Sequence, residues 1–148
     1  MTTVAFHTDV TDKVRYTYRL ARKAVRRGLR VCIAGQEGDL DLLDQALWTI
    51  EAHDFLPHGR MKSTVAPAAA LKRAPIWLTD APQAWPAEWP QAQVLIQVDP
   101  DMDIDPAPFE RAFVLLGPDA QEKAAGRKRW RTLQGLGYAV QHLSTTPS

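Results

Sequence analysis

The sequence lacks the features of secreted, membrane-spanning and disulfide-stabilised proteins. Of its 148 residues only Cys32 is a cysteine, which excludes an intramolecular disulfide and is typical of the reducing cytoplasm. The first residues show no basic segment followed by an apolar one, and no apolar run approaches the roughly 20 residues that span a bilayer. We therefore expect a cytoplasmic protein with no membrane contact.

The sequence also lacks the motifs on which nucleotide, metal and nucleophilic sites are built. Gly35 and Gly38 do not have the spacing of a dinucleotide fingerprint, Glu37 between them would repel a phosphate, and no Gly-Lys-Ser/Thr loop is present. The four histidines show no zinc-ligand spacing, and Cys32 lies in an apolar run rather than at an exposed turn. We predict no cofactor, no metal and no active site; a small nucleotide-dependent enzyme is the less favoured alternative.

Net charge is scarce as well. The chain has 18 basic and 17 acidic residues, a formal charge of +1, whereas dedicated nucleic-acid binders are usually far more basic. The charges are unevenly placed, because residues 99–110 are acidic without a basic residue and residues 123–131 are strongly basic. Such segregation favours an electrostatic surface for a partner.

Apolar segments alternate with helical patterns along the chain. Short apolar segments predict strands over residues 4–7, 31–34, 76–78, 94–98, 109–116 and 138–143, and residues 59–73 read as a surface loop. Periodicity predicts helices over residues 13–27, 40–50 (with Asp39 as N-cap) and 119–136. This order indicates one α/β domain over residues 1–143, with a mostly parallel sheet and helices on both faces, followed by a frayed tail over residues 144–148.

The last predicted helix carries the most specific surface. Lys123, Arg127, Trp130 and Arg131 fall at positions i, i+4, i+7 and i+8, so they share one face. A cationic face with a flat aromatic side chain suits either a nucleic acid or an acidic peptide with an apolar end. The low net charge favours the peptide, because phosphate contacts dominate nucleic-acid affinity; direct nucleic-acid binding through this helix is the alternative.

Three pieces of the sequence together resemble a known family. They are Leu43-Asp44-Gln-Ala-Leu47-Trp48, then Phe55-Leu56-Pro57-His58, then Arg127-Lys-Arg-Trp130-Arg131 before Gly137-Tyr138. They resemble the chi subunit family of bacterial DNA polymerase III, and the resemblance spans nearly the whole chain. It implies a single-domain, three-layer Rossmann-like fold without a nucleotide site, and an accessory subunit of the clamp-loader assembly without an active site.

The resemblance also implies two protein partners. The first is the acidic C-terminal tail of single-stranded-DNA-binding protein, with a site at Lys123, Arg127, Trp130 and Arg131 and with Leu116 as its floor. The family's aromatic position is often tyrosine and is Trp130 here. The second partner is the psi subunit, which connects the family to the clamp loader, with a contact region at Trp48, Phe55 and Leu56. From the residues alone, Leu47 and Leu56 are equally consistent with simple core positions.

Overall fold

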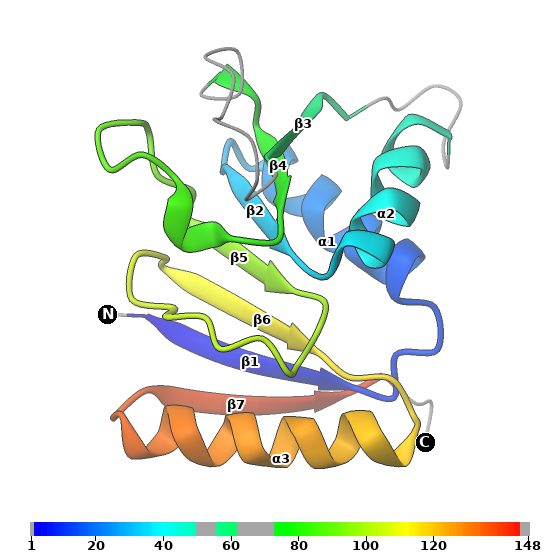
Figure 1. Cartoon of the computed structure of the whole chain (residues 1–148), viewed down its shortest axis with the longest axis vertical. Helices are drawn as coiled ribbons and strands as arrows, with labels where there is room; N and C mark the ends of the chain where they lie inside the picture. The colour runs from blue at the N-terminus through cyan, green and yellow to red at the C-terminus, as the bar shows by residue number, and fades with distance from the viewer. Residues whose placement is uncertain (1, 50–55, 62–72, 146–148) are drawn as a thin grey trace.

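A seven-stranded sheet, in which all strands run parallel, organises the chain (Figure 1). The computed structural model describes residues 2–49, 56–61 and 73–145. The strands are β1 (Thr3–Thr8), β2 (Val31–Ala34), β3 (His58–Met61), β4 (Ile76–Thr79), β5 (Val94–Gln97), β6 (Arg111–Leu115) and β7 (Ala139–Ser144), in the spatial order β3-β4-β2-β5-β6-β1-β7. The helices are α1 (Lys13–Arg26), α2 (Glu37–Thr49) and α3 (Ala120–Gly135), with a short 3-10 turn, η2 (Pro82–Ala84).

Alternating side chains divide the core into two layers. Along β2, Val31 and Ile33 pack in one cluster with the buried faces of α1 and α2, whereas Cys32 belongs to a second cluster that contains Leu133 of α3. Figure 1 shows α3 alongside β7, well away from α1 and α2. The predicted α/β fold, three-layered and Rossmann-like with helices on both faces, is therefore confirmed.

Aspartates fix the starts of two helices. The Asp12 side chain accepts a hydrogen bond from the Arg15 backbone N–H at 3.1 Å, and the Asp119 side chain accepts from Glu122 N–H at 2.9 Å. Each satisfies one of the backbone donors that a helix start leaves without a partner. Helix α2 behaves differently, because it begins at Glu37 and the predicted cap, Asp39, lies inside it. The Asp39 carboxylate reaches back to accept from Gln36 N–H at 3.2 Å.

Two further boundaries differ from the sequence-based expectation. The chain forms β3 at His58–Met61, of which we predict residues 59–61 to be loop, and only Met61 in this strand is fully buried. An edge strand without an apolar run leaves no periodic signal. At the other end β7 includes Ser144, and Thr145 N–H donates to Thr8 O at 3.0 Å. Regular pairing therefore continues past residue 143, and residues 146–148 lie outside the described ranges.

Candidate functional site

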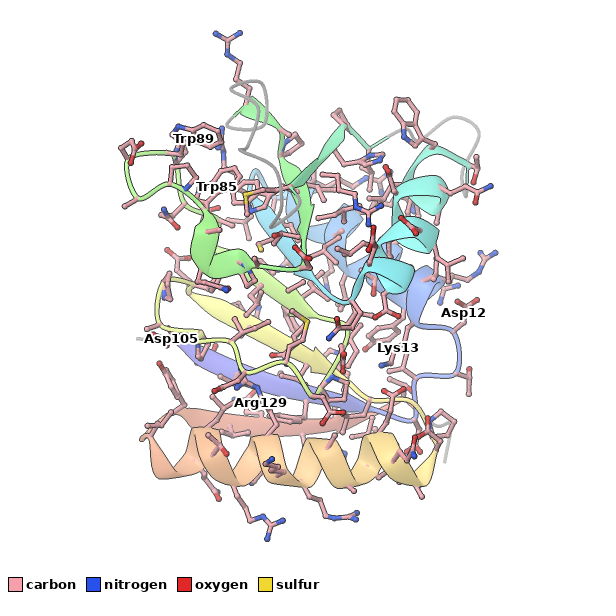
Figure 2. The ribbon with its side chains drawn as sticks, viewed as in Figure 1. Asp12, Lys13, Trp85, Trp89, Asp105 and Arg129 are labelled. Atoms are coloured by element: carbon pink, nitrogen blue, oxygen red, sulfur yellow. The ribbon has the colours of Figure 1, made fainter. Side chains whose placement is uncertain are left out.

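The start of α3 is anchored to the opposite layer of the molecule. Glu122, in the first turn of α3, accepts a hydrogen bond from Gly117 N–H at 3.1 Å and forms an ion pair with Lys13 of α1. The Lys13 ammonium also donates to Val98 O at 2.6 Å, and Figure 2 shows Lys13 at the start of its helix, facing the sheet end. These bonds fix the first turn of α3 near the carboxyl ends of the strands.

A cavity of about 700 Å³ lies where α3 meets the ends of β1 and β7. Its volume is in the range of small-ligand pockets. The lining residues come from β1 and the turn after it, from the end of β6, from one face of α3, and from β7: Phe6, Thr8, Asp9, Leu116, Lys123, Gly126, Arg127, Trp130, Arg131 and His142.

The floor of this cavity is apolar and closely packed. Phe6 and Leu116 are buried at 2% and 5% exposure, and the half-buried Trp130 ring packs against Phe6 with ring centroids 5.2 Å apart. A Cβ at Gly126 would lie only 2.3 Å from Leu116 Cδ1. Glycine is therefore what lets Leu116 pack directly against the helix backbone, beside a fixed aromatic wall.

The rim is cationic. Lys123, Arg127 and Arg131 are exposed on α3, and one carboxylate opposes them, because Asp9 Oδ1 lies 4.0 Å from Lys123 Nζ. Asp9 has a positive φ of 59°, which aspartate tolerates better than most residues. His142 completes the rim and its Nε2 is hydrogen-bonded to Thr8 Oγ1 at 2.8 Å. Three cations against one carboxylate make this an anion-attracting site with an apolar floor.

Another cation of the basic segment, Arg129, points away from the cavity and is buried. Only 6% of its surface is exposed, and Figure 2 shows it directed from α3 toward the chain that contains Asp105. Its guanidinium donates to Ile104 O and lies 3.5 Å from Asp103 Oδ1. Burial lowers the pKa of Arg129, and Asp103 and Asp105 act in the opposite direction. The acidic residues 99–110 thus supply a counterion for Arg129 inside the protein. The uneven charge along the sequence suggested only a surface for a partner.

All five residues predicted for the tail site line this one cavity: Leu116, Lys123, Arg127, Trp130 and Arg131. The sequence reasoning missed the cavity residues from the strands, among them Phe6, Asp9 and His142. It also missed Gly126, for which a signal existed, because glycine in a helix interior costs stability and needs a packing reason.

The second predicted group is only partly at the surface. Trp48 is 59% exposed on α2, whereas Leu56 is 5% exposed and belongs to the core beneath the same helix. Leu56 therefore takes the core alternative, because a buried side chain has no surface to offer a partner. Phe55 lies outside the described residues.

His58 connects the two sequence pieces that contain this group. Its Nε2 lies 2.8 Å from Asp44 Oδ1, its Nδ1 lies 2.8 Å from Leu56 O, and its ring meets the Trp48 ring edge-on at 5.3 Å. The two pieces are thus neighbours in space, and His58 helps to hold Trp48 in place at the surface.

The chain shows little support for other chemistry. The first turn of α2, where a parallel α/β fold would cradle a phosphate, carries Glu37 and Asp39. Within residues 2–49, 56–61 and 73–145, no three His, Cys, Asp or Glu side chains come close enough to hold a metal ion. Burial raises the pKa of Cys32 to about 12, so it is a packing residue rather than a nucleophile. None of the helices in that part of the chain is long and apolar enough to cross a membrane.

A comparison with protein-family models gives a match over nearly the whole chain. The family model described as DNA polymerase III chi subunit, HolC, matches residues 1–141 of the 148. No curated protein matches the chain.

Proposed function

The chain belongs to the DNA polymerase III chi subunit family, so its role is that of a replication accessory subunit, and from this premise we propose its partners. The cavity beside α3 binds the acidic C-terminal tail of single-stranded-DNA-binding protein. A second surface around Trp48 binds the psi subunit and through it the clamp loader. The protein works as a connector and has no active site of its own.

The cavity carries this proposal, because it combines the two properties that such a tail requires. Carboxylates are recognised by guanidinium and ammonium donors, and Lys123, Arg127 and Arg131 present three of these at the rim. An apolar terminal side chain needs an apolar wall, and Phe6 and Trp130 supply one. A plain electrostatic patch would have the first property without the second.

A peptide titration tests the tail site. The purified protein is titrated with the acidic tail peptide of the cognate single-stranded-DNA-binding protein, and Arg127→Ala should weaken binding by about 1–3 kcal/mol, the scale of a charge-assisted hydrogen bond. The control is Lys128→Ala, which removes the same charge from the next exposed position but does not line the cavity. Equal losses for both variants would contradict a specific site.

Salt separates the two halves of the proposed contact. The ion pairs at the rim are screened beyond a Debye length of about 8 Å at physiological salt, whereas apolar contact with Trp130 is not. Binding should therefore weaken with salt toward a resistant remainder, which Trp130→Ala removes; Arg131→Ala should instead reduce the salt slope. Wild-type affinity of Trp130→Ala at high salt would exclude the aromatic wall from the site.

The psi contact has its own matched control. Trp48 and Leu42 are both 59% exposed on α2, and their six-residue separation puts them about 120° apart around the helix. Trp48→Ala should abolish co-purification with psi, and Leu42→Ala should preserve it. The opposite result would move the contact to another face of α2.

The two alternatives predicted from the sequence remain open to direct tests. If the basic face of α3 binds DNA rather than the tail, single-stranded DNA should compete with the peptide and should lose affinity in Arg127→Ala. If the protein uses nucleotides, ATP or GTP should raise its melting temperature. We expect no competition by DNA, because the apolar wall formed by Phe6 and Trp130 suits the end of the tail. We expect no nucleotide effect, because the first turn of α2 presents carboxylates to a phosphate.

A further inference from the structure

Helix α1 and the turn after it form a second cationic surface, which the proposed function does not use. Between residues 13 and 30 the chain has eight basic residues and no acidic one. The rest of the chain therefore has 10 basic against 17 acidic residues. The net charge of +1 averages a strongly positive helix with a negative remainder, and it does not describe the surface that a ligand would meet.

Three of these cations form a stripe along the exposed side of α1. Arg19, Lys23 and Arg27 are exposed and fall at positions i, i+4 and i+8, so they lie about 6 Å apart along the helix axis. We call these three residues the α1 stripe. They border a hollow of about 280 Å³ whose lining is entirely basic: Arg19, Arg22, Lys23, Arg26 and Arg27.

The α1 stripe concentrates positive charge on one side of the helix. Like charges at i and i+4 on a helix repel one another, and among the described residues no carboxylate lies within ion-pair distance of the stripe, although Asp12 lies 3.9 Å from Arg15 one turn earlier. The helix tolerates this because its other face is buried through Tyr18 and Ala21. A row of anions along the stripe would relieve the repulsion.

The surroundings of the stripe favour a nucleic-acid strand over an acidic peptide. A neighbouring hollow of about 400 Å³ shares Lys23 and Arg27, adds Arg111, and has an apolar floor that includes Leu20 and Phe113. A single strand offers both regularly spaced phosphates and unpaired bases with apolar faces, which such a combination accommodates without reading sequence. A duplex hides its bases, and a peptide of alternating carboxylates lacks them.

We propose that the α1 stripe binds the phosphate backbone of single-stranded DNA without sequence preference. This contact goes beyond the tail site and does not depend on it, because the stripe and the cavity beside α3 have no cation in common. It also revises our expectation that the protein makes no direct nucleic-acid contact, which rested on the low net charge and on the acidic residues 99–110.

Two charge-matched triple variants test this. The first is Arg19→Gln/Lys23→Gln/Arg27→Gln, and the control is Lys123→Gln/Arg127→Gln/Arg131→Gln, which removes the same charge from α3. Binding of a fluorescent oligothymidine is followed by anisotropy over a salt series. Each phosphate contact contributes about −0.7 to the slope of log K against log salt for single strands. Loss of three contacts should therefore reduce the steepness of this slope by about 2 in the stripe variant. Its affinity at low salt should fall at least roughly tenfold. The control should bind DNA as the wild type does.

The same two variants are titrated with the tail peptide and melted thermally. The stripe variant should still bind the tail peptide, and the control variant should lose this binding. The melting temperatures of both variants should stay near that of the wild type. Loss of DNA binding in the control alone would place DNA on α3 and overturn the proposal. Equal loss in both variants, no binding of the oligothymidine at low salt, or equally tight binding of polyglutamate to the stripe would also overturn it.

Discussion

Gly126 offers the most direct test of the cavity beside α3. A methyl group there would lie 2.3 Å from Leu116 Cδ1 and 2.8 Å from Cδ2, whereas apolar carbons pack at about 3.5–4.0 Å. In Gly126→Ala the end of Leu116 must therefore retreat by about 1–1.5 Å to restore normal contact. The open space next to it is the cavity, so the variant should fill the floor on which the apolar end of the tail would rest.

The two consequences of Gly126→Ala have different sizes. Replacing a helix-interior glycine by alanine contributes about 1 kcal/mol to stability, and forced repacking costs about 1–3 kcal/mol, so the net change in unfolding free energy should stay below about 2 kcal/mol. Excluding an apolar side chain from its wall removes up to about 1.5–3 kcal/mol. We expect the tail peptide to bind about 10- to 150-fold more weakly by calorimetry, with a fold that melts near the wild type.

Gly135 provides the control, because it lies in the same helix and a Cβ there would meet nothing within 4 Å. Gly135→Ala should bind the peptide like the wild type and be equally or more stable. If Gly126→Ala binds the peptide as tightly as Gly135→Ala does, Leu116 does not floor the tail site and the argument from the cavity fails.

Three further outcomes follow from individual side chains. Asp9→Asn removes the carboxylate that opposes Lys123, so it should tighten tail binding by a few-fold, the scale of an exposed pair; unchanged or weaker binding would show that Asp9 does not compete with the ligand. Burial, Arg111 and His142 lower the pKa of His7 from 6.5, so the unfolded chain takes up this proton first and stability falls as pH drops below about 6.5; melting temperatures of His7→Asn should fall less steeply there, and identical slopes would argue against it. Cys32 should react with a thiol reagent only on unfolding, since burial raises its pKa to about 12; rapid labelling of the native protein would contradict this.

The part of the site that could be predicted from the sequence lies on a single element, the helix α3. The rotation of a helix places Lys123, Arg127, Trp130 and Arg131 on one face without reference to the rest of the chain. The same rotation puts Arg129 on another face, but its burial became evident only with Ile104 and Asp103 in place. Phe6 and His142 could not be assigned to the cavity, because β1 and β7 are brought together by pairing between distant segments.

The misses in the fold have similar causes. Continuous apolar runs predict the buried strands, as at β2 and β5. By contrast, among the residues that the structure describes β3 pairs only with β4, and it has a single buried residue. Net charge is a weak guide to a surface because it discards the positions of the charges. The sum of +1 contains both the α1 stripe and the acidic residues 99–110, which lie on different parts of the surface.

The position of β1 in the sheet sets the order in which the protein can be assembled. β1 pairs only with β6 and β7, and the hydrogen bond between Thr8 and His142 at the cavity rim joins residues 134 positions apart. At a synthesis rate of about 5–20 residues per second, β1 waits roughly 7–27 s for its last partner, with Val4 and Phe6 still uncovered. Helices α1 and α2 and the strands between them can pack during that interval, but the cavity still lacks the side chain that β7 supplies, His142. A chain interrupted before β7 would already carry Phe6, Leu116 and Trp130 but would lack His142 and the strand that pairs with β1, so the complete cavity depends on the last strand to be translated.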